Sequence, residues 1–473
     1  MNINSIIDLI ISTCRSPILI RLVNRFAVNK NRIQRERLIN AVTKHLLADY
    51  GREGMFGDLS VFEAKNLQLM HDNLLLRKLK SRAEGSVGGR HKRLINSINN
   101  IQQRTERLKQ LDGPDVIRFL SSLYLEDIAP DFDPVFLILF RSLAKRLFNN
   151  FVNSIRAVEI KTGALNELSN LIGKEPVFFI ANHISNADHL PILFALNQAA
   201  IISPVVIGGS NLYHGVSKKI LPKINVCQIK RDDMIEKKIK WLGNPVYIET
   251  FKQHNQYMWL HNEPYLFYPE GGRSRNGKIM PPKVGIIKNI FEFVKNENQQ
   301  VHFIPLSISY TSVPEDLAIE ESRKGVNISY SDLIQELVNL NREYSRIKDT
   351  DIHVNLGLPI TVAPDNIPDL EEFSYELMNR VRDGIHPTST YEVAQMILFY
   401  SDSLDTSEAN CFSVDDLKNA NPGYSAERLS SAIEIFTAKK FIAPAKEPDV
   451  QNLFNIINPD MLRQYANRTE CEF

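Results

Sequence analysis

The residues best suited to acid–base chemistry are His183 and Asp188, which stand five positions apart just after the apolar run 177–180. The loop and first helical turn between them can bring the carboxylate onto one ring nitrogen of the histidine. The other nitrogen is then free to take a proton, so the pair can act as a general base with its orienting partner. No neighbouring serine or cysteine is needed as nucleophile, because a substrate hydroxyl can attack instead. A lone His/Asp pair more often caps a helix or sits in a core, so the hypothesis needs a second segment.

That second segment supplies groups that bind anions. Arg273 and Arg275 carry planar guanidinium donors suited to phosphate, while Gly271 and Gly272 allow backbone N–H groups to approach the same anion. Glu270 can hold the arginines in place or bind a substrate hydroxyl. The alternative, a charged turn fixed by an Arg–Glu pair, does not easily explain two glycines followed by two arginines. We therefore expect a transfer reaction on a phosphorylated alcohol.

A third basic pair, Lys230 and Arg231, follows the apolar run 226–229. Placed at the end of another strand, it can close the phosphate pocket. Taken alone, the pair is a weak indication.

Short apolar runs between residues 159 and 357, bounded by Gly, Pro and Asn, predict the buried strands of an α/β sheet. They cover 177–180, 204–207, 226–229, 265–268, 301–309 and 353–356. The candidate residues lie just past the ends of these runs, where open α/β sheets place their ligand crevice. The uncharged stretch 190–216 is predicted to form a buried helix, a turn and a buried strand rather than a membrane span.

Helical patterns flank this region on both sides. We predict an N-terminal helical region (1–125), an α/β domain with a mixed sheet flanked by helices (126–385), and a small C-terminal winged-helix-like module (386–473). Glu427 and Glu434 in the second helix of that module make it a poor DNA reader, so a packing role is favoured.

Composition excludes some classes of protein. The 56 Lys and Arg against 55 Asp and Glu disfavour a nucleic-acid binder, and the four cysteines show no metal-binding spacing, which indicates a reducing compartment. The apolar stretch 3–22 is interrupted by charges and resembles neither a signal peptide nor a spanning helix.

Basic residues are concentrated in 77–93. A solvated face is the favoured interpretation, and a patch for anionic lipid or an acidic carrier protein is the alternative. The amphipathic helix expected at 134–152 also suits a membrane surface.

At these residues the chain resembles the glycerolipid acyltransferase superfamily, which includes glycerol-3-phosphate and lysophosphatidate acyltransferases. Residues 182–188 match its NHxSxxD block, and residues 268–275 match its FxEGxRSR block. Three further segments, 229–231, 304–307 and 356–360, are similar to other blocks of the family, so that the resemblance covers roughly 159–361. Gly272 followed by Arg-Ser-Arg is nearer the glycerol-3-phosphate branch. Asn182 and Pro269 are common in the lysophosphatidate branch.

The resemblance implies an enzyme that transfers a fatty acyl group from coenzyme A or acyl carrier protein to the sn-1 hydroxyl of glycerol 3-phosphate. It implies that His183 takes the hydroxyl proton and that Asp188 orients the ring, with no metal and no further cofactor. The substrate-binding positions that it implies are Lys230, Arg231, Glu270, Gly271, Gly272, Arg273, Ser274 and Arg275. Because the product is a membrane lipid, we expect peripheral attachment to the cytoplasmic face of a membrane.

Two alternatives stay open. The acceptor can be lysophosphatidate or another lysolipid. The chain can also be an inactive binding or regulatory protein, against which the neutral charge balance and the intact His183 and Asp188 argue.

Overall fold

The fold was determined as a computed structural model. It describes residues 35–51, 58–157, 164–201, 203–213, 215–230, 243–323, 333–346, 350–403, 411–445 and 452–473. Contacts between residues divide the chain into two compact units. Among the described residues, unit 1 contains residues 135–206 and 262–473, and unit 2 contains residues 35–134 and 207–261. The N-terminal stretch 3–22, which is apolar but interrupted by charged residues, lies outside the described residues.

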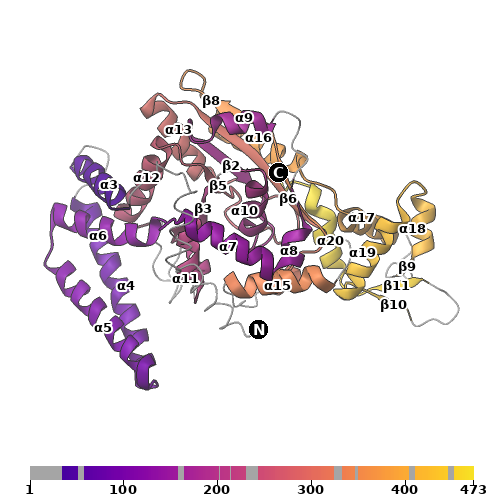
Figure 1. Ribbon diagram of the computed structural model, residues 1–473, viewed down its shortest axis with the longest axis horizontal. Coiled ribbons are helices and arrows are strands. Elements are labelled where there is room, and N and C mark those ends of the chain that lie inside the picture. Colours follow the sequence, from indigo (N-terminus) through magenta and orange to yellow (C-terminus); the bar gives the residue numbers. More distant parts are fainter. Residues whose placement is uncertain are drawn as a thin grey trace. The chain divides into compact units, whose positions relative to one another are not determined.

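Unit 2 is mainly helical, as predicted for the N-terminal region. Its longer elements are α3 (Arg35–Asp49), α4 (Asp58–Glu84), α5 (Gly88–Lys109), α6 (Gly113–Ile128), β4 (Val226–Ile229) and α12 (Pro245–Leu260). Figure 1 shows α4 and α5 side by side as a helical hairpin. Asn244 ties α12 to α6, since its Oδ1 caps the Tyr247 N–H at 3.0 Å and its Nδ2 donates to the Tyr124 hydroxyl at 3.1 Å. Gly88 and Gly89 open helix α5.

Unit 1 is built on a mixed sheet. Its strands are β1 (Ile155–Ala157), β2 (Val177–Ala181), β3 (Val205–Gly209), β5 (Tyr265–Phe267), β6 (Val301–Tyr310), β7 (Ile352–Leu356) and β8 (Ile360–Val362). Among these strands the order is β1-β7-β6-β2-β5-β3, with β8 also paired to β6. Strand β2 is parallel to both β5 and β6, whereas β7 and β8 are antiparallel to β6. The expected mixed sheet is therefore confirmed, and the short strands β1 and β8 are additions to the prediction.

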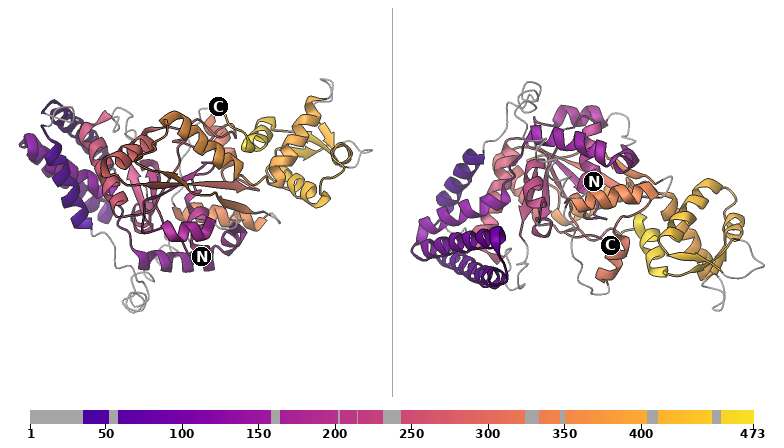
Figure 2. Two further views of the ribbon diagram at one scale, coloured as in Figure 1. Left: turned by 90° about the horizontal axis from the view of Figure 1, so that it is seen from above. Right: turned by 60° about the horizontal axis from the view of Figure 1, so that its bottom comes forward.

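Helices cover both faces of this sheet (Figure 2). The helices of the sheet region are α7 (Pro134–Leu147), α8 (Asn149–Ser154), α9 (Ala164–Leu171), α10 (His189–Gln198), α13 (Gly285–Glu297), α14 (Asp316–Arg323), α15 (Leu333–Arg346) and α16 (Leu370–Asp383). On one face Phe303 of β6 meets Phe373 of α16, with ring centroids 5.1 Å apart. Elsewhere in the core Phe151 of α8 contacts Phe194 of α10 at 6.0 Å, which joins these two helices. The sheet is thus buried between two helical layers, as its apolar runs require.

The uncharged stretch 190–216 contains α10 and β3, as predicted. Across the described part of the chain, every helix is either too short or too polar to span a bilayer.

The C-terminal part of unit 1 adds a second, smaller sheet. Its elements are α17 (Ser389–Asp402), β9 (Cys411–Ser413), α18 (Val414–Ala420), α19 (Ala426–Ala438), β10 (Ile442–Pro444), β11 (Leu453–Ile456) and α20 (Pro459–Ala466). The three strands pair antiparallel in the order β10-β11-β9. Helices α17, α18, α19 and α20 agree with the helical pattern predicted on this side of the α/β region.

Candidate active site

Three parallel strands deliver the candidate residues to one edge of the sheet. Strands β2, β5 and β6 end at Ala181, Phe267 and Tyr310, and their carboxyl ends meet because the strands run in the same direction. Loop 182–188 follows β2, and loop 268–280 follows β5. The two segments that sequence analysis singled out are therefore neighbours in space.

His183 and Asp188 form the predicted pair. The Nδ1 atom of His183 lies 2.8 Å from Oδ2 of Asp188. The histidine side chain is 19% exposed and the aspartate is fully buried. A carboxylate at Nδ1 keeps the ring proton on that nitrogen and leaves Nε2 as the atom that can accept a proton.

The position of Asp188 is itself fixed by several donors. The backbone N–H groups of Ile184 and Ser185 donate to its carboxylate at 2.7 and 3.0 Å, and the Tyr310 hydroxyl donates to Oδ1 at 2.8 Å. Asn182 also joins loop 182–188 to β6, because its side chain exchanges two hydrogen bonds with the Ile308 backbone. This carboxylate therefore has little freedom to turn away from the imidazole.

The backbone of His183 is held by the second loop. Its N–H donates to Oε1 of Glu270 at 2.6 Å, and its carbonyl accepts from the Ser274 N–H at 3.1 Å. Oε2 of Glu270 accepts from the Met280 N–H at 2.9 Å. Burial raises the pKa of Glu270 to about 8, and these two N–H donors act against that rise. Glu270 thus fastens loop 268–280 to the histidine rather than serving as an exposed group.

The ring of His183 also stacks on Tyr268, with centroids 4.4 Å apart and an angle of 22° between the rings. The Tyr268 hydroxyl is buried and has no hydrogen-bond partner among the described residues. Burial raises the pKa of this phenol well above its usual value. The Tyr268 ring therefore packs against one face of the imidazole.

Arg273 is anchored by a residue that sequence analysis missed. Its guanidinium Nη1 lies 3.0 Å from Oε1 of Glu315. The Glu315 carboxylate also accepts from the Ser185 hydroxyl at 2.7 Å and from the Asn186 N–H at 2.9 Å. Glu315 follows β6 and so reaches the same sheet edge as His183. Glu315 lies five residues past the end of β6, and that position was the sequence feature that could have identified it.

The other predicted anion-binding residues differ in their surroundings. Gly271 has φ +67° and lies beside the Lys283 side chain, whereas Gly272 faces open space. Ser274 is buried and donates to the Lys278 carbonyl at 2.6 Å, so its hydroxyl shapes the loop. Arg275 is exposed.

The basic pair after β4 belongs to unit 2. Nζ of Lys230 pairs with Asp127, and its N–H donates to the Tyr247 hydroxyl at 2.7 Å. Arg231 lies outside the described residues. The expected closure of a phosphate pocket by these two cations stays a prediction.

Residues 467–472 form hydrogen bonds with loop 268–280, and we call this contact the clasp. Ile279 exchanges backbone hydrogen bonds with Glu470 and Glu472 at 2.8 and 2.9 Å, and Asn467 donates to the Asn276 carbonyl at 2.9 Å. Arg468, in the same segment, is 2% exposed, and its guanidinium has no hydrogen-bond partner among the described residues. Its positive charge counters the burial effect on the pKa of Glu270.

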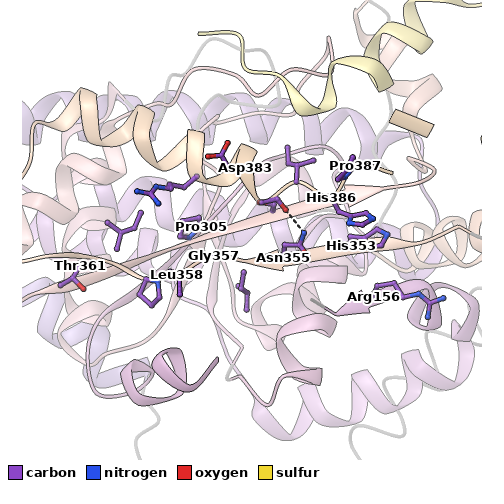
Figure 3. A pocket seen from close by; sticks show the side chains of 17 residues that line it. Arg156, Pro305, His353, Asn355, Gly357, Leu358, Thr361, Asp383, His386 and Pro387 are labelled. Carbon is purple, nitrogen blue, oxygen red and sulfur yellow. Dashed lines mark hydrogen bonds between the residues drawn. The ribbon is translucent and has the colours of Figure 1, made fainter. Parts of the chain in front are cut away.

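A cavity of about 970 Å³ lies elsewhere in unit 1 (Figure 3). Its lining residues include Ser307, Asn355 and His353, whose register places them on the face of the sheet opposite Tyr310. The rings of His353 and His386 stack there at 3.8 Å, and burial lowers the pKa of His353 to about 4. His183 and Asp188 do not line this cavity, so it is separate from the candidate active site.

Comparisons with known proteins find similarity to acyltransferases. Residues 156–309 match the family described as Acyltransferase, a range that includes both candidate loops. The chain is 25% identical over 258 residues to a glycerol-3-phosphate acyltransferase of Alteromonas mediterranea, covering 52% of this chain and 29% of the relative. It is 26% identical over 275 residues to the enzyme of the same name from Pseudoalteromonas translucida, covering 56% of this chain and 30% of the relative.

The chain therefore spans less than a third of the length of these curated relatives. Among solved structures, it is similar to the 1-acyl-sn-glycerophosphate acyltransferase of Thermotoga maritima. That match has a TM-score of 0.27 and 12% identity, and it covers 52% of this chain and 80% of the other.

Proposed function

We propose that the protein transfers a fatty acyl group from a thioester to the sn-1 hydroxyl of glycerol 3-phosphate, because residues 156–309 match the Acyltransferase family and similar curated proteins are named glycerol-3-phosphate acyltransferase. The product is lysophosphatidate, a precursor of membrane phospholipids. The observation that supports this proposal most is the His183–Asp188 pair, with Nδ1 and Oδ2 2.8 Å apart and the carboxylate fixed by three further donors. Such a pair suits an enzyme whose nucleophile is the hydroxyl of its own substrate.

The proposed chemistry needs one base. Nε2 of His183 takes the proton of the acceptor hydroxyl as its oxygen attacks the thioester carbonyl carbon. A C–O bond forms and the C–S bond breaks, and the imidazolium returns its proton to the departing thiolate. Asp188 stabilises the imidazolium through Nδ1–H. A positioned base of this kind contributes about 100- to 10,000-fold in rate.

Arg273 is the proposed phosphate ligand. Glu315 pairs with its guanidinium and so holds it at the same sheet edge as His183, and a planar guanidinium is well suited to phosphate oxygens. The same carboxylate is bonded to loop 182–188, so the cation and the base are set at a fixed separation. Gly272, with open space around it, allows the backbone to approach the phosphate, and exposed Arg275 is a second candidate ligand.

The donor in this proposal is an acyl thioester of coenzyme A or of acyl carrier protein, and no further cofactor takes part. The product is amphiphilic, so we propose that the protein works at the cytoplasmic face of a membrane as a peripheral protein.

The C-terminal module supports this function in a structural way. Its element order, helix, strand, two helices and two strands, is that of a winged-helix fold, and we infer that it is winged-helix-like. Glu427 and Glu434 are exposed on α19, the helix that would enter a DNA groove, so a packing role is favoured over nucleic-acid binding. Its contacts with Ile279 brace the loop that holds His183.

A direct assay tests the proposal. Purified protein is incubated with an acyl-coenzyme A, and thiol release is followed with glycerol 3-phosphate, lysophosphatidate or glycerol as acceptor. The proposal predicts release that depends on glycerol 3-phosphate and is weak with glycerol, which lacks the phosphate. Release only with lysophosphatidate would assign the alternative acceptor. No release with any acceptor, from either coenzyme A or carrier-protein thioesters, would favour an inactive binding protein.

A further inference from the structure

The turn between α4 and α5 gathers positive charge. Residues 77–93 contain seven Lys and Arg residues and one acidic residue, Glu84, although the whole chain has a formal net charge of only +1. All seven side chains are exposed: Arg77, Lys78, Lys80, Arg82, Arg90, Lys92 and Arg93. We call these seven residues the hairpin patch. The helices that carry it pack along each other within unit 2 (Figure 1).

The hairpin patch differs from the cations nearer the base of the same helices. Arg104 of α5 pairs with the buried Asp72 of α4, and Lys109 pairs with Glu106 at 2.7 Å. Lys65 of α4 pairs with Asp112 at 3.3 Å. By contrast, none of the seven patch residues forms an ion pair with another described residue. The cations near the base are therefore neutralised within the fold, whereas those of the hairpin patch are not paired with described residues.

Apolar side chains lie among these charges. Val87, in the turn itself, is 89% exposed, and Ile95 on α5 is 36% exposed. A valine at the tip of a hairpin, surrounded by cations, suits a surface that has an anionic layer over an apolar interior. A lipid surface offers both an anionic layer for the cations and an apolar region for the valine, and we therefore choose it as the partner.

We propose that the hairpin patch is a docking surface for an anionic phospholipid bilayer. The cations pair with lipid phosphates, and Val87 enters the interfacial layer. The choice of a lipid surface rests in part on the proposed lipid product, whereas the binding itself needs no catalysis.

The test uses the full chain and two vesicle compositions. Sedimentation with phosphatidylcholine vesicles is compared with sedimentation with vesicles that also contain phosphatidylglycerol. The patch variant carries Arg77→Gln, Lys80→Gln, Arg90→Gln and Lys92→Gln. A matched control removes four exposed cations elsewhere: Lys174→Gln, Lys288→Gln, Lys295→Gln and Arg342→Gln. Both variants have the same net charge, and both are checked for unchanged thermal unfolding and thiol release.

Wild type is expected to bind only the anionic vesicles, and to bind them less as salt rises. Each Lys or Arg at such a surface accounts for about fivefold in binding, so the patch variant should bind roughly several hundredfold more weakly. The control variant should bind within a few-fold of wild type. Equal loss in both variants, or no loss in the patch variant, would overturn the proposal. So would retention of wild type on an immobilised acidic carrier protein or on polyadenylate with none on anionic vesicles. Failure of acyl transfer with intact vesicle binding would count against the proposed function alone.

Discussion

At the scale of residues, the proposed base is held from four directions. Asp188 fixes Nδ1 of His183, Tyr268 supports the ring, Glu270 binds its N–H, and the Ser274 N–H binds its carbonyl. Three of these four contacts come from loop 268–280. Loops 182–188 and 268–280 are therefore joined by hydrogen bonds, and Glu270 of the second loop positions the backbone of His183 in the first.

The sequence indicated the candidate residues of this site better than their hydrogen-bond partners. His183, Asp188 and Arg273 could be picked out because their types and spacing are unusual at strand ends. Glu315 and Tyr310 could not, since each is ordinary in its own segment and becomes informative only when β6 is known to lie beside β2. Hydrogen-bond partners that are distant in sequence depend on strand order, which a linear pattern does not specify.

The first prediction separates the two arginines. Arg273→Ala should raise KM for glycerol 3-phosphate by about 10- to 100-fold with a smaller change in kcat, because a bidentate charge-assisted contact to phosphate is lost. KM for the acyl thioester should stay near that of wild type. Steady-state thiol release measures both constants. Arg275→Ala, which removes the second candidate ligand, should have the weaker effect because that side chain is exposed. An unchanged KM for glycerol 3-phosphate in Arg273→Ala would show that the Arg273–Glu315 ion pair only holds the two loops together.

The second prediction concerns the dependence of stability on pH. Burial raises the pKa of Glu270 from an ordinary 4.5 to about 8. Between these values the folded protein keeps a proton that the unfolded chain releases, so this group's stabilisation is full below the unfolded pKa and is lost as pH rises to about 8. Glu270→Gln cannot titrate. Urea unfolding of both proteins at several pH values should therefore show wild type losing stability relative to the variant over this interval. A difference that grows in favour of wild type with rising pH would contradict the assignment.

At the scale of elements, the site depends on strands that run in the same direction. The apolar runs predicted β2, β5 and β6 with ends close to those observed, because fully buried strands need continuous apolar sequence. Strands β1 and β8, with three residues each and polar Arg156 and Thr361 at their centres, carry too little pattern to be recognised. The antiparallel direction of β7 likewise follows from the chain path and not from composition.

The third prediction tests the clasp between the C-terminal segment and loop 268–280. Gly277 has φ +92°, and a Cβ there would lie 2.1 Å from the Gln464 carbonyl oxygen. Gly277→Ala should therefore cost about 3 kcal/mol or more of stability, since the left-handed backbone and the clash with main chain add together. Gly173→Ala is a matched control, because Gly173 has φ +75° with open space around it.

The control should cost only about 1–2 kcal/mol. Thermal unfolding gives the size of both effects, and limited proteolysis shows whether residues 389–473 have become loose. Equal effects of the two substitutions would mean that the clasp adds nothing beyond local backbone strain.

At the scale of the whole molecule, the helices of unit 2 come from two separate stretches of sequence. Helix α12 packs with α3, α4 and α6, although more than a hundred residues separate α12 from α6. Composition along the chain suggests contiguous regions and gives no sign of such a return. The overall charge balance is equally uninformative about the hairpin patch, whose seven cations are offset by acidic residues elsewhere. The chain also spans less than a third of its curated relatives, so the roles of its outer parts must be measured on this protein itself.

The measurement that tests the central claim most directly is single-turnover acyl transfer by wild type and His183→Ala with glycerol 3-phosphate and an acyl-coenzyme A. Transfer to the sn-1 oxygen should slow by about 100- to 10,000-fold in the variant, with unchanged thermal unfolding, because the only change is loss of the base. Lysophosphatidate formed by the variant at the wild-type rate would contradict the account.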